Sequence, residues 1–346
     1  MLTYHSASIQ QLTVHYTGNP TQDEPLTLAD GLITPDETLQ ETLLSYFLGS
    51  FKPEAFYHFN TAGNKVYNAC KEIFSEKGDF LKASSQIAST LYDVSTHPRI
   101  LGGDLFVARI GGVNLHNEFY DAIVILKAEQ EDKFLQVEWQ GAQPEIVLAN
   151  AYRTDRIDKA CLVFSNEEAD GYRVLVIDKT NGNSGEAQYW LDAFLELETV
   201  EDSYHFTKQC MHAYKDFVKE ELPENFEVNP AEQIALLSRS SKYFKEKDTF
   251  DFDNFASEVI QQQEVADAFR TYARDYSSDG EHSITESFDI NPSAVKKHAG
   301  MFKSILKLDK NFHIYVHGNR NLIERGYDDQ KNMNFYKVYF SNETTS

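Results

Sequence analysis

"DLFVARIGGV", residues 104–113, and "FYDAIVILK", residues 119–127, decide the fold predicted for this chain. Both runs are rich in β-branched and aromatic residues, the side chains that strands favour. Similar runs follow after short polar turns: FLQVEW (134–139), EIVLA (145–149), ACLVF (160–164) and YRVLVID (172–178). Parallel neighbours need a crossover of about a dozen residues or more, which these turns cannot supply. The sequence therefore predicts a largely antiparallel sheet.

Helices are expected to cover this sheet. After a first strand at about residues 4–16, apolar residues recur at three-to-four spacing in segments 37–51, 64–74 and 79–93, which predicts three helices. Helical patterns return from about residue 201. We therefore predict an α+β fold in two domains. Residues 1–198 form the antiparallel sheet with its helices, and residues 199–346 form a mostly helical domain that ends in a basic β-hairpin.

Capping residues place several of the later helices. Asn229–Pro230 and Asn291–Pro292 each combine a capping side chain with proline at the first helical position. Further helices are predicted at 254–261, capped by Asp253 or Asn254, and at 265–276. Gly300 is expected to end the helix whose last turns carry Lys296, Lys297 and His298, where cations suit the helix dipole.

The turn LDKN, residues 308–311, predicts a hairpin with a defined register. A two-residue loop would mix charge into the apolar face, whereas a three-residue loop, 309–311, separates an apolar core face from a cationic face. The apolar face then pairs Leu308–Phe312, Leu306–Ile314 and Ser304–Val316, and the cationic face pairs Lys307–His313, Ile305–Tyr315 and Lys303–His317. We therefore predict the three-residue loop.

The composition is that of a globular protein of 346 residues, 41% hydrophobic and 25% charged. The N-terminus alternates apolar and polar residues as a strand does, so no signal peptide is expected. No window approaches the roughly 18 consecutive apolar residues of a membrane span. Cys70, Cys161 and Cys210 are too scattered for a disulfide framework or a zinc site. These features favour a reduced compartment, the cytoplasm.

Charge is distributed unevenly along this acidic chain, whose formal net charge is −22. Residues 1–51 contain no Lys or Arg, whereas residues 296–325 contain seven against two acids, a local balance of +5. Exposed charges farther apart than a Debye length, about 8 Å at physiological salt, interact weakly. A cationic patch near the C-terminus can therefore bind a polyanion in spite of the acidic body.

This cationic segment is the candidate DNA-binding surface, because Lys and Arg neutralise phosphates and an aromatic ring packs against sugar or base. The candidate DNA-binding residues are Lys296, Lys297, Lys303, Lys307, His313, Tyr315, His317, Arg320 and Arg325, with Arg239, Lys242, Lys245 and Lys247 as further contributors. The alternative is a solvated strand face whose lysines only discourage edge pairing, with Arg320 and Arg325 paired to nearby acids.

Metal sites and catalytic sites are less favoured. His205, Cys210 and His212 lie only loosely on one side of a helix, and no fourth ligand is evident. Asp251 and Asp253 could hold magnesium in a nuclease, but Asp-x-Asp before an apolar helix is more often a cap. No phosphate-binding loop or nucleophile elbow occurs. We predict no catalytic residue, no metal and no cofactor.

Several motifs occur in an order that resembles the bacterial nucleoid-associated proteins of the NdpA type. They are GGDLFVARI (102–110), LVIDKTNG (175–182), EAQYWLDAFL (186–195), DTFDFDNFASEV (248–259), the predicted helix within 288–300, and IYVHGNRNLIERG (314–326). The resemblance covers nearly the whole chain, here with a longer C-terminal tail. It implies a cytoplasmic protein that associates with the nucleoid and binds DNA without enzymatic activity.

The resulting functional prediction is a non-enzymatic, nucleoid-associated protein that binds double-stranded DNA through its C-terminal basic face with low sequence specificity. The first alternative is an acidic adaptor that reaches the nucleoid by holding a basic DNA-processing protein. A metal-dependent nuclease is the second alternative. No membrane partner is expected, and homo-oligomerisation is left open.

Overall fold

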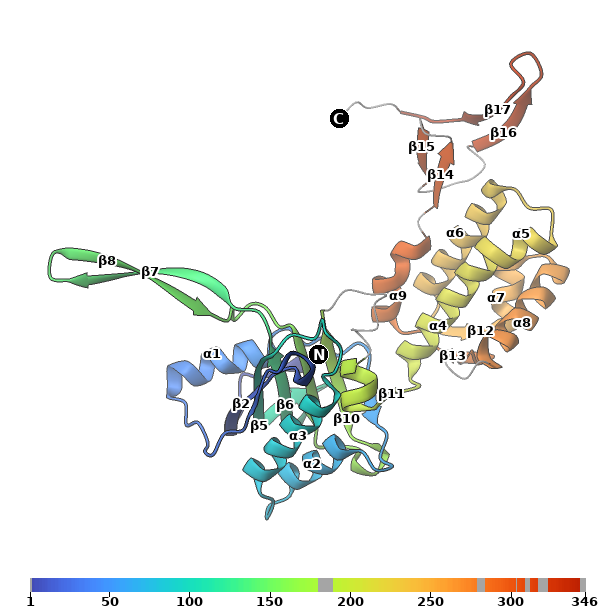
Figure 1. Ribbon diagram of the computed structural model, residues 1–346. Coiled ribbons are helices and arrows are strands. Elements are labelled where there is room, and N and C mark those ends of the chain that lie inside the picture. Colours follow the sequence, from blue (N-terminus) through green and yellow to red (C-terminus); the bar gives the residue numbers. More distant parts are fainter. Residues whose placement is uncertain are drawn as a thin grey trace. The chain divides into compact units, whose positions relative to one another are not determined.

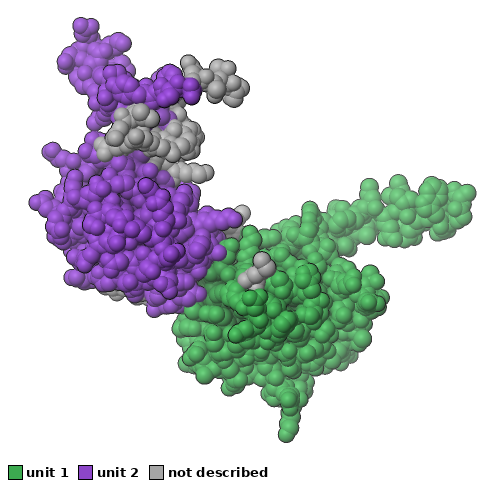
Figure 2. Space-filling view, turned by 180° about the vertical axis from the view of Figure 1, so that it is seen from behind, with its two compact units in different colours: residues 1–200 green, residues 201–346 purple. Residues whose placement is uncertain are grey.

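The computed structural model describes residues 2–179, 189–278, 284–302, 304–308, 312–316 and 323–342 (Figure 1). The chain divides into two compact units, Met1–Val200 and Glu201–Ser346 (Figure 2). The first unit, unit 1, is built on a sheet with helices, and the second, unit 2, is mainly helical with short hairpins. The predicted α+β class is confirmed.

Unit 1 is organised by a nine-stranded sheet in the order β11-β4-β10-β9-β6-β5-β2-β3, with β1 paired to β5. The strands are β1 (Leu2–Thr3), β2 (Ser8–Thr17), β3 (Leu26–Thr27), β4 (Tyr57–Phe59), β5 (Gly103–Leu115), β6 (Glu118–Ala128), β9 (Lys159–Phe164), β10 (Arg173–Asp178) and β11 (Leu197–Thr199). Every pair in the sheet is antiparallel, as predicted. The short connections between β5 and β6 and between β9 and β10 allow only this direction for those two pairs.

Helices cover both faces of this sheet (Figure 1). The helices are α1 (Glu37–Leu48), α2 (Lys65–Phe74), α3 (Phe80–Val94) and the π-helix η3 (Tyr189–Leu195). Alternate residues of the central strands point to opposite faces, so Val107 and Ile125 pack with α2, α3 and η3, whereas Ala108 and Val124 pack with α1. The three predicted helices are confirmed.

One hairpin of unit 1 stands apart from the sheet. It consists of β7 (Asp132–Gln140) and β8 (Gln143–Ala151), which pair only with each other as a separate two-stranded sheet. Both segments were predicted as strands. Figures 1 and 2 show the hairpin projecting from the body of unit 1, and residues Asp132–Ala151 are called the arm below.

Unit 2 packs helices around an aromatic core. Its elements are α4 (Ser203–Asp216), η4 (Phe217–Glu221), α5 (Leu222–Asn225), α6 (Pro230–Glu246), β12 (Thr249–Asp251), α7 (Phe252–Phe255), η5 (Ala256–Ile260), α8 (Gln263–Ser278), β13 (Ser287–Asp289), α9 (Pro292–His298) and η6 (Ala299–Phe302). Tyr214 lies in this core, where its ring centroid is 4.8 Å from that of Phe255 and 5.0 Å from that of Phe269, both in edge-on arrangements. Offset and edge-on aromatic pairs of this kind stabilise a core beyond simple burial.

Helix starts in unit 2 follow the predicted caps at two places and differ at a third. Asn229 forms a capping box with Glu232, and the Asn291 side chain accepts from the first turn of α9. The expected cap at Asp253 or Asn254 is wrong, because Asp251 accepts from the Asn254 backbone N–H at 2.9 Å. A cap accepts from the residue two or three positions later, which moves the start of this helix to Phe252.

The end of α9 also differs from the prediction. The α-helix stops at His298, and a 3₁₀ turn, η6, continues through Gly300 to Phe302. Phe302 is buried in the unit 2 core, which favours continuing the turn over a glycine stop.

Two hairpins follow: β14 (Ser304–Leu308) with β15 (Phe312–Val316), and β16 (Ile323–Asp328) with β17 (Met333–Val338). The β14–β15 register pairs Leu308 with Phe312 and Lys307 with His313, so the predicted three-residue loop is confirmed. The expected core at that end is wrong, because Phe312 is 65% exposed. A two-stranded hairpin has no second layer to bury that ring.

None of the described helices is both long enough and apolar enough to cross a membrane.

Candidate nucleic-acid interface

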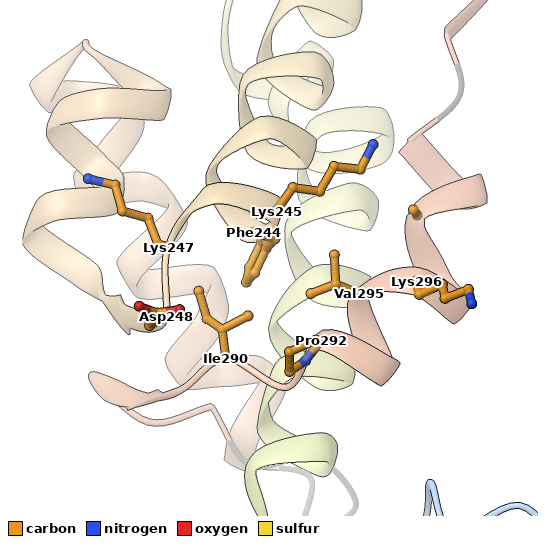
Figure 3. A pocket seen from close by; sticks show the side chains of 9 residues that line it. Phe244, Lys245, Lys247, Asp248, Ile290, Pro292, Val295 and Lys296 are labelled. Carbon is orange, nitrogen blue, oxygen red and sulfur yellow. The ribbon is translucent and has the colours of Figure 1, made fainter.

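A cavity of about 380 Å³ lies in unit 2 between the C-terminal end of α6 and helix α9 (Figure 3). Its apolar part is formed by side chains such as Phe244, Ile290 and Val295, which point toward one another in the view. Lysines from both helices stand at the rim. The residues that line it are Phe244, Lys245, Lys247, Asp248, Ile290, Pro292, Val295, Lys296 and Ala299. The cavity therefore brings together cations that lie about fifty positions apart in the sequence.

Lys245 and Lys296 are the accessible cations of this rim. Both are exposed, and Figure 3 shows their side chains extending to the same side, away from Lys247. Within the described part of the chain neither ammonium forms an ion pair with a carboxylate. A cation without a protein counter-charge keeps its full attraction for an anionic ligand.

The other three cations predicted to contribute on or after α6 are engaged within unit 2. Lys247 donates to Glu258 at 2.7 Å, which raises the pKa of the lysine. Lys242 lies 3.9 Å from Glu246, and Arg239 donates through Nε to the Val259 carbonyl oxygen at 2.6 Å. The charges of Lys242 and Lys247 are therefore offset in part by carboxylates, whereas the Arg239 guanidinium is directed toward a backbone carbonyl oxygen of unit 2.

Helix α9 continues the cationic surface toward α4, which it contacts. Lys297 is exposed, and its Nζ lies 5.9 Å from the ring centroid of Tyr204. Burial lowers the pKa of Lys208 on α4, and the nearby charge of Lys297 adds to the effect. The electrostatic repulsion between these two lysines indicates a region of positive potential. Lys208 could not be identified from the sequence because its partner comes from a different helix.

The β14–β15 hairpin lies beside α6. Its register sets Lys307 opposite His313 and Ile305 opposite Tyr315, so these positions share one face of the ladder. Arg325, on β16, is exposed and donates to the Asn334 side chain at 3.3 Å. The other three predicted contacts, Lys303, His317 and Arg320, lie outside the described residues.

Two histidines, His212 on α4 and His298 on α9, connect these two helices. Nε2 of His212 lies 3.3 Å from Nδ1 of His298, so one ring donates and the other accepts. Burial lowers the pKa of His212 to about 4, and the charges of His298, Lys208 and Lys215 act in the same direction. His212 is therefore neutral at physiological pH and holds α9 in place.

We expect the protein to lose stability as the pH falls from about 6.5 to about 4. In this window the unfolded chain binds a proton at His212 that the folded chain does not, so protonation favours unfolding. Since the ring is only partly buried, solvent screening limits the loss to the order of 1 kcal/mol. Denaturant unfolding at several pH values measures it, and His212→Asn should flatten the dependence. An identical pH profile in that variant would contradict the assignment.

The residues considered as metal ligands take part in the packing, capping and ion pairing of unit 2. Cys210 is fully buried, which raises the pKa of its thiol, and no group of three or more metal-ligating side chains occurs among the described residues. Asp251 caps a helix, and the Asp253 carboxylate pairs with Arg270. These two carboxylates therefore serve the local fold.

A buried ion cluster in unit 1 was not foreseen. Lys127 and Lys159 face each other on β6 and β9, both almost fully buried. Lys159 Nζ lies 2.9 Å from Asp178 Oδ1, and Lys127 Nζ lies 3.3 Å from Glu129 Oε1. Burial lowers the pKa of Lys127, while Glu129 opposes that change. The lysine that ends the apolar run FYDAIVILK was the available signal, since a lysine at an inward strand position needs a counter-charge.

These features define an acidic α+β protein of two units, in which unit 2 presents exposed lysines at the rim of one cavity. The sequence model of the family of nucleoid-associated protein YejK (NA37) matches residues 9–334, and the chain belongs to this family. The resemblance drawn from the order of the motifs is thereby confirmed, and with it a nucleoid-associated role. The match ends inside β17, so the last strand extends past it. No curated protein matches the chain.

Proposed function

We propose that the protein is a non-enzymatic nucleoid-associated protein that binds double-stranded DNA directly and with low sequence specificity through a cationic surface of unit 2. The observation that carries the proposal is the pair of uncovered lysines, Lys245 and Lys296, at one rim. Lys297 on α9 extends the surface, and the register of the hairpin beside α6 places Lys307 opposite His313. Phosphates along a duplex are the polyanion that such a spread of lysines suits.

Low sequence specificity follows from the kinds of side chain on this surface. Lysine is a flexible point charge that contacts phosphates, whereas bases are read by planar or bidentate groups in a groove. Lys245 and Lys296 come from two different helices, α6 and α9, so the surface is not one recognition helix presented to a groove. Contacts to the sugar–phosphate backbone therefore dominate.

The affinity for duplex DNA should depend steeply on salt. If about six phosphates are contacted, the dissociation constant rises roughly a thousandfold between about 50 and 200 mM monovalent salt. Fluorescence anisotropy of a labelled duplex with the purified protein measures this slope. A slope near zero, or no binding at the lowest salt, would refute direct electrostatic binding.

The acidic adaptor is the second candidate, and the charge of unit 1 favours it. Residues 1–200 contain 14 Lys and Arg against 29 Asp and Glu, a balance of −15. A field of that sign attracts a basic partner and slows the approach of DNA to the same unit. Purified protein separates the two functions, because the adaptor requires its partner before it is retained on DNA.

A further inference from the structure

The arm of unit 1 carries an apolar face that nothing in the described chain covers. Its register sets Leu135 opposite Leu148, Val137 opposite Ile146 and Trp139 opposite Pro144. Residues directly opposite in an antiparallel pair lie on the same side of the ladder. Three successive apolar pairs therefore form one continuous stripe about 14 Å long.

This stripe is open to solvent. Leu135 is 73% exposed, and Trp139 and Ile146 are each 68% exposed. At about 150–250 Å² for each large apolar residue, the stripe exposes about 600 Å², the upper end of what a monomer usually presents as one patch. Such a surface on a protein of this charge indicates a binding function.

The opposite face of the arm carries Phe134 opposite Ala149 and Gln136 opposite Val147 near the base, and only its outer part is polar. It places Glu138 directly opposite Glu145 and Gln140 opposite Gln143. Like charges at directly opposed positions destabilise a strand pair, and a lone two-stranded hairpin is marginal in water. Burying the apolar stripe would supply the stabilisation that the arm lacks by itself.

The base of the arm is nevertheless fixed to the body of unit 1. The Asp132 carboxylate lies 3.9 Å from Arg153 and 3.7 Å from Arg156, and Arg156 also donates to the Gln130 side chain. Backbone N–H groups of Glu129 and Gln130 donate to Asp158. The arm is thus held outward from a defined point.

Charge argues against a nucleic acid as the occupant of the stripe. Residues 132–151 contain Asp132, Glu138 and Glu145 against Lys133 alone. Binding to phosphates needs cations, and the stripe itself has none. The partner of the stripe should therefore present a flat, apolar and uncharged surface. The stripe of a second copy of the arm is such a surface, and it has the same dimensions.

We propose that the apolar stripe is a self-association surface, on which the arm of a second copy of the chain packs face to face. Two stripes would together remove about 1,200 Å² from water, within the range of specific protein interfaces. A two-fold axis through the centre of the stripe brings the same residues of both copies together. The two ladders then lie about 10 Å apart, as in a small β-sandwich.

Pairing through arms also suits the overall charge. Nine-residue strands extend about 30 Å, well beyond the Debye length of about 8 Å. The acidic bodies of the two copies can therefore remain far enough apart for salt to screen their repulsion. Of the charged residues of the arm, Asp132, Glu138 and Glu145 lie on the opposite face, and Lys133 lies on the face of the stripe at its base, next to the Leu135–Leu148 pair.

Sedimentation equilibrium of the full chain at tens of micromolar tests the proposal with one matched pair of variants. The wild type should show twice the chain mass of 39.6 kDa. Val137→Lys places a charge in the stripe and should weaken dimerisation at least about tenfold. Gln136→Lys introduces the same side chain one residue away on the opposite face, where Gln136 pairs with Val147, and should leave the mass unchanged.

A cross-link gives a readout that does not depend on weakening the dimer. The chain's three cysteines are buried, so a cysteine introduced on the arm is the accessible thiol. Val137→Cys should form a disulfide-linked dimer under mild oxidation, and Gln136→Cys should not. A monomeric wild type, a dimer insensitive to Val137→Lys, or equal cross-linking of both cysteine variants would overturn the proposal. The proposal would also be overturned if Val137→Lys lost DNA binding while its sedimentation mass stayed that of the dimer.

Discussion

Charge reversal by Lys245→Glu together with Lys296→Glu should lower the affinity for duplex DNA about a hundredfold at about 100 mM salt. Each phosphate contact accounts for close to a tenfold change in affinity per tenfold change in salt, and glutamates at the rim add repulsion. Both side chains are exposed at the cavity rim, so the fold should tolerate the change. Fluorescence anisotropy measures the affinity, and circular dichroism checks the fold.

The matched control is Lys52→Glu with Lys77→Glu, two exposed lysines of unit 1. It changes the net charge of the chain by the same amount but leaves the unit 2 surface intact. We expect a loss of affinity of less than about threefold, because distant charges are screened. Equal losses in the two double variants would mean that net charge, and not the rim, controls binding.

Removal of a buried counter-charge should have the largest effect on stability. Asp178→Ala leaves the Lys159 ammonium almost fully buried without the carboxylate that lies 2.9 Å from it. Breaking a buried pair in this way costs about 3–5 kcal/mol of the free energy of unfolding. Urea unfolding of the full chain, followed by circular dichroism, measures the loss.

Two further variants distinguish the ion pair from a general effect of losing an acid. Asp170→Ala, at an exposed position on the turn before β10, should change the free energy of unfolding by no more than about 0.5 kcal/mol. Lys159→Met combined with Asp178→Leu should recover most of the loss, because apolar side chains of similar size replace a buried pair at little cost. Asp178→Ala behaving like Asp170→Ala would show that the pair does not support the sheet.

Much of the first unit could be predicted from local patterns. Strands β5, β6, β9 and β10 are visible as β-branched runs because strands buried on both faces must be apolar along their length. The helices α2 and α3 show an apolar periodicity, and Asn64 and Asp79 cap them. The β14–β15 register was also predictable, since a shift by one residue moves every side chain to the other face.

The candidate site was only partly predictable. Lys296 was recognised by its position in a cationic segment, and Lys245 was included as a contributor. Their meeting at one rim depends on how α6 and α9 pack. The neutralisation of Lys247 by Glu258 could not be predicted, because the two residues lie on different elements and meet only after η5 folds back beside α6.

The arm illustrates the same limit. Its two strands were predicted, but they were expected to belong to the main sheet. Every local signal of FLQVEW and EIVLA is that of a strand, and strand propensity does not tell whether the apolar side is covered. Coverage depends on what lies on either side of the hairpin in space, and only the tertiary structure shows that the stripe is open.

By itself, the sequence determined the α+β class, the antiparallel direction of the strands, most helix starts and the uneven distribution of charge. These properties follow from interactions between residues near each other along the chain, which periodicity, caps and turn lengths record. The tertiary structure alone decided which lysines remain uncovered, which are buried against carboxylates and which apolar stripe faces water. Those outcomes depend on contacts between distant segments, and electrostatic and hydrophobic energies are set by such contacts at distances of a few ångströms.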